Sequence, residues 1–249
     1  MRSWLTKTFR SINSRRTLPA RTCFAVLFPG RTGSSHLISC LAQHPEIFVE
    51  GEKLVRLELQ EQEEYLRGLY RGDRNARIRS VGFKTKLKDV ASLDDFAATL
   101  RANDVRIITL VRENRLKLAI STLNARRIHS QYGRWNLVKS ESRLPPLDAS
   151  VDEIVSMLTR VDEAQRDVLS FAATLSLPRL DLTYETLLRD HDATIARVEH
   201  FLNVEALPLT GSVEKATDDD LRQSVVAYGE LAERLRGSAY ASDIAEPAA

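Results

Sequence analysis

The stretch of residues 23–41 constrains the fold more than any other part of the chain. Residues 23–28 form a short, continuous apolar run, which is typical of a buried strand in a parallel sheet. A proline and two glycines then break the run, and from Ser34 onward apolar residues recur at helical spacing. We therefore expect a strand, a tight glycine turn and the N-terminus of a helix.

A turn of this kind suits the binding of an anion. Its glycines let the backbone close around a charged group, and the free N–H groups of the helix N-terminus favour phosphate or sulfate. Arg31 adds a positive charge, and Ser34 and Ser35 add hydroxyl donors. The stretch predicts a site for a phosphate-like group, with a purely geometric role of the glycines as the alternative.

Two common nucleotide motifs do not match this turn. Only two residues separate Gly30 from Gly33, and Ser34 stands where the Walker A motif has lysine. The dinucleotide fingerprint G-x-G-x-x-G is missing as well. The sequence therefore argues against an ordinary NTPase and against a dinucleotide-dependent enzyme.

Composition narrows the class of protein further. With 249 residues, 43% hydrophobic and 28% charged, the chain suits one α/β domain with a sizeable core. A net charge of +2 implies no strong field for nucleic acid, and no apolar run approaches the ~18 residues of a membrane span. Cys23 and Cys40 are lone and lie in apolar surroundings, so we expect small core residues and a cytoplasmic protein.

The N-terminus differs from the rest of the chain. The first 21 residues carry six basic side chains and no acidic one. We expect a solvated basic tail over residues 1–21 and a single domain over residues 22–244. Four apolar residues alternate with the basic ones, which leaves open a weak contact with an anionic membrane surface.

Strand and helix patterns alternate along the remaining chain. Further strands are expected at 47–49, 81–86, 105–111 and 179–184, and helices at 54–70, 93–100, 116–123, 151–176, 193–202 and 218–235. This alternation predicts a P-loop-like, three-layer α/β/α fold with a central parallel sheet.

A second cationic turn follows the strand at 105–111. Arg112 comes directly after it, and ligands of open α/β sheets bind beyond the carboxyl ends of the strands. Two cationic turns at one edge fit a ligand with two anionic groups. Residues 131–150 are irregular and predict a surface loop or lid, in which Trp135 either covers a ligand or packs against the body.

Five segments, taken together, resemble the sulfotransferases that use 3′-phosphoadenosine 5′-phosphosulfate (PAPS), especially the bacterial and Golgi carbohydrate-type branches. They are F-P-G-R-T-G-S-S at 28–35, His44-Pro45 followed by Gly51-Glu52, the stretch 111–121, L-T-Y-E-T-L-L at 182–188, and Lys215 with the tail 228–240. Three details depart from the family pattern. Arg112 and Ser121 are nine residues apart where many members have eight, Arg31 replaces a lysine, and the tail has Ala227-Tyr228-Gly229.

The resemblance implies a role for each matched residue. The 5′-phosphosulfate group would be bound by the loop that comprises Pro29, Gly30, Arg31, Thr32, Gly33, Ser34 and Ser35. Arg31 would also neutralise the charge that grows on the leaving oxygen. Arg112 and Ser121 would hold the 3′-phosphate, and Lys215 would contact the nucleotide.

The acceptor hydroxyl needs a base, and the family match favours Glu52. Glu50 is the second candidate, although an acidic residue at either position could simply start the next helix. His36 and His44 are further alternatives. Lys84 and Lys86, at the end of another strand, would bind the sulfate or the acceptor or would simply be solvated.

We therefore expect a sulfotransferase that acts on a hydroxyl of a saccharide, glycolipid or other small acceptor. The alternatives are a kinase with a degenerate phosphate loop and a non-catalytic nucleotide-binding protein. No Cys/His/Asp cluster has close metal-ligand spacing in the sequence, so no metal is expected. Neither the acceptor nor the oligomeric state follows from the sequence.

Overall fold

The structure is a computed structural model that describes residues 21–72, 74–135, 144–211 and 220–244. Its strands form one parallel sheet with the order β2-β3-β1-β4-β5. The strands are β1 (Thr22–Leu27), β2 (Ile47–Glu50), β3 (Ser80–Thr85), β4 (Arg106–Val111) and β5 (Arg179–Thr183). Each lies within one residue of its predicted range. Most residues of the inner strands β1, β3 and β4 are buried because helices cover both faces of the sheet, whereas the edge strands β2 and β5 are more exposed.

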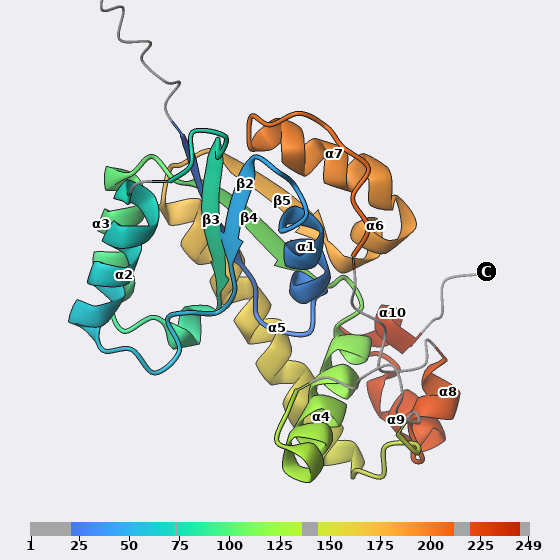
Figure 1. The fold of residues 1–249 in the computed structure, drawn as a ribbon. Helices are drawn as coiled ribbons and strands as arrows, with labels where there is room; N and C mark the ends of the chain where they lie inside the picture. Colours follow the sequence, from blue (N-terminus) through green and yellow to red (C-terminus); the bar gives the residue numbers. More distant parts are fainter. Residues whose placement is uncertain (1–20, 73, 136–143, 212–219, 245–249) are drawn as a thin grey trace, which may run out of the picture.

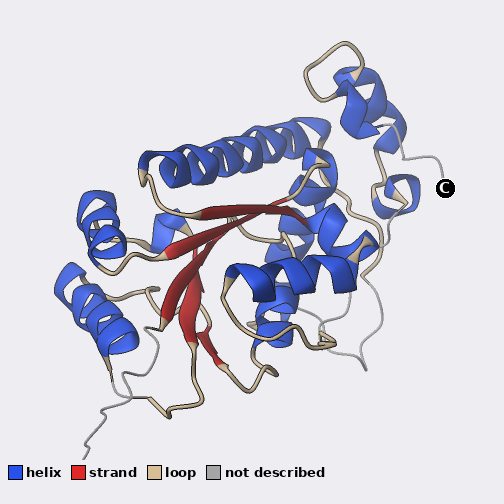
Figure 2. Ribbon diagram, turned by 90° about the horizontal axis from the view of Figure 1, so that it is seen from above, coloured by secondary structure: helices blue, strands red, loops and turns tan. Residues whose placement is uncertain are grey.

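Two sets of helices cover the two faces of the sheet (Figures 1 and 2). One face packs against α1 (Ser34–Leu41), α6 (Tyr184–Arg189) and α7 (His191–Phe201). The other packs against α2 (Leu59–Arg71), α3 (Leu93–Ala102) and α5 (Val151–Thr174). Alternate residues of β1 serve the two cores, with Phe24 and Val26 on one side and Ala25 and Leu27 on the other. The predicted three-layer α/β/α class is confirmed.

A helical group extends beyond the carboxyl end of β4 (Figure 1). It consists of α4 (Arg115–Tyr132), α8 (Leu221–Ser224), α9 (Tyr228–Leu235) and α10 (Ala241–Ile244), packed around the first half of α5. The core of the group includes Leu116, Ile154 and Leu231, all fully buried. Within the ranges described, no helix combines the length and the apolar character needed to cross a membrane.

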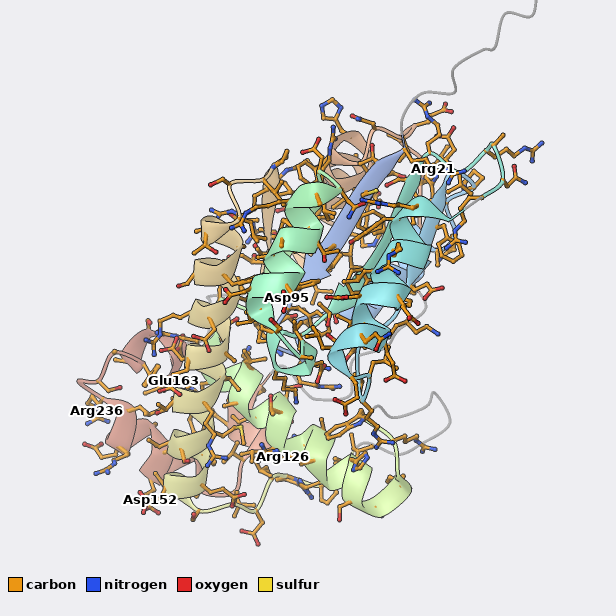
Figure 3. All side chains as sticks on the ribbon, turned by 90° about the vertical axis from the view of Figure 1, so that its left-hand side faces the viewer. Arg21, Asp95, Arg126, Asp152, Glu163 and Arg236 are labelled. Atoms are coloured by element: carbon orange, nitrogen blue, oxygen red, sulfur yellow. The ribbon has the colours of Figure 1, made fainter. Side chains whose placement is uncertain are left out.

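The long helix α5 follows its predicted pattern closely. Its predicted inner stripe, from Ile154 to Ala172, is buried at every position named: Ile154, Leu158, Val161, Val168 and Ala172. Charged residues such as Glu163 on α5 and Asp95 on α3 are exposed, and Figure 3 shows them on the outside of the helical layer. The helices are therefore held to the sheet by one apolar side each.

Three predicted helices differ from the structure. The helix expected at 116–123 continues to Tyr132 as α4. The helix expected at 54–70 begins only at Leu59, because Arg56 adopts a positive φ of 65° and Glu58 forms a capping box with Glu61. The helix expected at 218–235 is wrong as one element. Within it, Val225 forms a parallel bridge with Leu147, and this pairing separates α8 from α9. The short 3-10 turn Leu87–Asp89 and α10 were not predicted.

Gly82 of β3 offers a test of the sheet core. It lies opposite Phe24 of β1, and a Cβ at this position would come within 2.5 Å of the Phe24 ring. We expect Gly82→Ala to lower the free energy of unfolding by about 1–3 kcal/mol, since the overlap forces a buried ring and two central strands apart.

Gly68 on the exposed side of α2 is the matched control, because an added Cβ would meet nothing within 4 Å. Gly68→Ala should raise the free energy of unfolding by about 1 kcal/mol. Urea unfolding of the two variants checks both signs. Equal stability of Gly82→Ala and the wild type would contradict the close packing of β1 against β3.

Candidate anion-binding site

The predicted glycine turn lies between β1 and α1. Gly30, Arg31 and Gly33 have positive φ angles of 119°, 55° and 80°, so the backbone turns sharply before Ser34 begins the helix. The first turn of α1 has no acidic residue, and Gly33 provides no side-chain cap. Thr32 is fully buried, and its Oγ1 has no hydrogen-bond partner among the described residues. The N-terminal amides of α1 therefore suit an anionic ligand.

Lys84, at the end of β3, reaches the first two residues of α1. Its Nζ donates to Ser35 Oγ at 2.9 Å and to Ser34 Oγ at 3.3 Å. Burial and, second, the charge of Arg31 lower the pKa of Lys84 to about 8. A buried cation at a helix N-terminus is unfavourable for the protein alone, and an anion bound there would compensate its charge.

Glu52 is held by the two lysines of this strand end. Its Oε1 lies 3.3 Å from Lys84 Nζ, and its Oε2 pairs with Lys86 Nζ. Lys86 also lies 3.7 Å from Asp89, and a Cβ added at Gly30 would lie 3.6 Å from its side chain. Ser35, Lys84 and Glu52 thus form a continuous polar chain from the loop to the carboxylate.

Glu50, the second candidate base, is engaged elsewhere. Its Oε2 accepts a hydrogen bond of 2.8 Å from the Tyr65 hydroxyl of α2, and burial and this bond raise the pKa of Tyr65. No contact between Glu50 and the loop is seen in the described part of the chain. Of the two glutamates, Glu52 is the one linked to the anion site.

Arg112 lies directly after β4 and is buried. Its guanidinium stacks on the Tyr184 ring at 4.3 Å, and its Nε is 3.8 Å from Glu185 Oε1. Tyr184 also packs against the glycine loop, because a Cβ added at Gly33 would come within 2.9 Å of its Cδ2. One aromatic ring therefore separates the loop from the second cationic turn.

Arg31 and Ser121 are hydrogen-bonded, whereas the resemblance implied that Ser121 would act together with Arg112. Arg31 Nε donates to Ser121 Oγ of α4 at 3.2 Å, and Arg31 Nη1 donates to the backbone oxygen of Trp135 at 3.1 Å. Burial and, second, the nearby charge of Arg112 lower the pKa of Arg31. Two like charges in one buried place are typical of a site for a polyanion.

Tyr184, Glu185 and Gln165 were given no role from the sequence. Glu185 accepts hydrogen bonds from the backbone N–H groups of Glu113 and Asn114, and Gln165 of α5 accepts one of 2.6 Å from the Arg112 N–H. They hold the turn that carries Arg112. Tyr184 and Glu185 could have been predicted from the segment 182–188, which matches a family motif. No motif near Gln165 indicated a role for it.

The two histidines proposed as alternative bases lie outside this polar chain. His44 Nε2 is 2.8 Å from the Glu205 oxygen, and its Nδ1 accepts from the Glu46 N–H, so both ring nitrogens serve the local fold. His36 packs against His191. Lys215, the tail 1–20 and residues 136–143 of the predicted lid lie outside the described residues. Trp135 is exposed and stacks on His129 at 4.2 Å.

The fold and the site together define an α/β protein with a P-loop-like anion site at the carboxyl edge of a parallel sheet. The chain is 29% identical over 242 residues to Nodulation protein H of Rhizobium meliloti, a match that covers 90% of this chain and 95% of that protein. The protein of the same name from Rhizobium meliloti strain 1021 is 28% identical over 242 residues, which again cover 90% of this chain and 95% of that protein. No protein-family model matches the chain.

Two solved structures match the chain over most of its length. A sulfotransferase from Alicyclobacillus acidocaldarius has a TM-score of 0.48 and 18% identity, covering 92% of this chain and 98% of that one. The mouse sulfotransferase SULT7A1 complexed with PAP has a TM-score of 0.46 and 13% identity, with 90% and 88% covered. Within the chain itself, the segments 28–35, 111–121 and 182–188 meet at one site.

The lowered pKa of Lys84 predicts how stability depends on pH. Lys84 binds its proton less tightly in the folded protein, with a pKa of about 8, than in the unfolded chain, where a lysine has its ordinary pKa of 10.5. Its contribution to stability is therefore complete above pH 10.5 and is lost as pH falls through 8. We expect the free energy of unfolding of the wild type to rise between these limits relative to that of Lys84→Met.

Urea unfolding at several pH values from 7.5 to 10 measures this difference, because the other titrating groups are common to both proteins. Lys88, exposed in the following turn, supplies the control Lys88→Met, which should keep the wild-type slope. A difference between the wild type and Lys84→Met that does not change with pH would contradict a buried, charged Lys84.

Proposed function

We propose that this protein transfers a sulfuryl group from PAPS to a hydroxyl of a saccharide, glycolipid or other small acceptor. One observation carries the proposal: Lys84 connects the loop serines at the α1 N-terminus to Glu52. The same site therefore contains a cation that could bind a sulfuryl donor and a carboxylate that could take the proton of an acceptor hydroxyl.

The charges of the site fit a donor with two anionic ends. The 5′-phosphosulfate would accept from the N-terminal amides of α1 and from Lys84 and Arg31. The 3′-phosphate would bind Arg112, whose guanidinium already lies on the Tyr184 ring beside the loop. Ser121 hydrogen-bonds to Arg31 here, so it would orient that arginine or serve the 3′-phosphate directly.

In the proposed reaction, the acceptor oxygen attacks sulfur in line with the bridging oxygen of the donor. The new O–S bond forms, the S–O bond to the phosphate breaks, and PAP leaves with the bond electrons. Glu52 takes the proton of the acceptor hydroxyl. Lys84 and Arg31 stabilise the charge on the sulfuryl and leaving oxygens, since transfers of this type depend on positioning and electrostatics.

Exposed aromatic rings support a sugar-containing acceptor. Trp135 is 55% exposed and Tyr132 is 45% exposed, and the backbone of Trp135 contacts Arg31 of the loop. An exposed aromatic ring on a residue that contacts the loop suits a saccharide, whose ring combines apolar C–H faces with hydroxyl groups.

Calorimetric titration with PAP, without metal ions, tests the two anion subsites. We expect Arg31→Ala and Arg112→Ala each to weaken binding by about 10- to 100-fold, because each removes charge-assisted hydrogen bonds to a phosphate. Arg126→Ala, at an exposed position of α4 (Figure 3), is the matched control and should bind like the wild type. Binding of ATP with Mg²⁺ but not of PAP would instead favour the kinase alternative.

Substitution of the proposed base tests the chemical step. Glu52→Gln should lower kcat by about 10²- to 10⁴-fold while leaving the affinity for PAP within a few-fold of the wild type. Glu50→Gln, whose carboxylate is bonded to Tyr65, is the control and should keep most of the activity. Rates with a panel of hydroxyl acceptors measure both. A fully active Glu52→Gln variant would remove the carboxylate from the mechanism.

A further inference from the structure

Three side chains with metal-binding atoms meet on the α1–α7 side of the sheet. His36 and Cys40 lie one turn apart on α1, and His191 begins α7. Their ligand atoms all lie within 4.8 Å of one another, and Cys40 Sγ is 3.6 Å from His191 Nε2. The sequence did not predict this group, because His191 is far along the chain from the other two.

The spacing of sulfur and nitrogen suits a tetrahedral zinc site. With a Zn–S distance of about 2.3 Å and a Zn–N distance of about 2.0–2.1 Å, tetrahedral angles put the two ligand atoms about 3.6 Å apart. Cys40 and His191 have this separation without any movement of the chain. Residues four apart on a helix, such as His36 and Cys40, share one face and can bind one ion.

The surroundings leave ring nitrogens available for a metal. His191 Nδ1 lies 3.0 Å from Asp192 Oδ1. If Nδ1 carries the proton and donates it to this carboxylate in a hydrogen bond, Nε2 has a lone pair on the side of the Cys40 sulfur. His36 Nε2 is buried and has no hydrogen-bond partner in the described ranges. The opposite edge of the His36 ring faces Gly211, where an added Cβ would come within 2.2 Å of Nδ1.

We propose that His36, Cys40 and His191 bind a single Zn²⁺ ion, with water in the fourth position. Asp192 orients His191 from the second coordination shell. The site adjoins the anion loop, because His36 follows Ser35, but it uses none of the residues that the proposed sulfuryl transfer assigns to the donor or to the base. It therefore stands independently of the proposed sulfuryl transfer.

The protonation states agree with such a site. Burial and the neighbouring His191 lower the pKa of His36, which favours the neutral ring that coordination needs. Burial raises the pKa of Cys40 to about 11, so the thiol is protonated without metal. When zinc binds, an S–Zn bond replaces the S–H bond, the proton goes to solvent, and the metal compensates the thiolate charge.

A metal at this place would join α1 to α7. Helix α1 begins at the anion loop, and His36 is its third residue, so the ion would hold the loop helix against its neighbour. Three protein ligands from two helices stabilise the folded chain, because the unfolded chain does not bring them together.

Cobalt titration of the tag-free, reduced, chelator-treated full chain tests the site, because Co²⁺ is a coloured substitute for Zn²⁺. We expect one equivalent of Co²⁺ to give the visible bands of tetrahedral coordination together with a thiolate-to-metal charge-transfer band. One equivalent of Zn²⁺ should abolish both. Cys40→Ser should lose the charge-transfer band, whereas Cys23→Ser, which removes the only other cysteine, should keep it.

Thermal unfolding provides a second measurement in case Cys40→Ser does not fold. Zn²⁺ should raise the Tm of the wild type and of Cys23→Ser but not that of His191→Gln, whose side chain is partly exposed. Asp192→Asn should weaken Zn²⁺ affinity by about 10- to 100-fold. The proposal is overturned if the wild type gives no charge-transfer band, or if His191→Gln gains as much Tm from Zn²⁺ as the wild type.

Discussion

The burial of Lys84 beside a helix N-terminus is the constraint on which the site depends. A cation is unfavourable at that end of a helix. It remains there because the Ser34 and Ser35 hydroxyls accept hydrogen bonds from it and Glu52 supplies a countercharge. Strand β3 places the lysine, strand β1 and its glycine turn place the serines, and the end of β2 leads to the glutamate. Three neighbouring parallel strands thus converge on one charge.

Much of the fold followed from local patterns. Apolar runs marked the inner strands β1 and β4, because both faces of the parallel sheet are covered there. The edge strand β5 was predicted although its residues alternate between polar and apolar. The prediction of a single helix over residues 218–235 was wrong for a physical reason. Its periodicity is helical, yet the backbone at Val225 pairs with Leu147, more than seventy residues earlier, and such distant pairing leaves no local trace.

The site was predictable to the extent that it is built from consecutive residues. The glycine turn and Arg112 stand at strand ends, where sequence and topology together indicate a ligand edge. Gln165 holds the Arg112 backbone from the middle of a long helix, and His191 joins two α1 residues across the core. Both contacts depend on tertiary packing, so the spacing of residues in the sequence did not predict them.

The ring of Tyr184 has a consequence for discrimination among nucleotides. It touches Gly33 of the loop on one side and the Arg112 guanidinium on the other, so neither subsite can shift without moving the same rigid plane. In the proposed donor complex, occupancy of one end would therefore be thermodynamically linked to occupancy of the other. A nucleotide with phosphates at both positions would then be selected by cooperation between the two ends, and one that lacks either phosphate would lose more than a single contact.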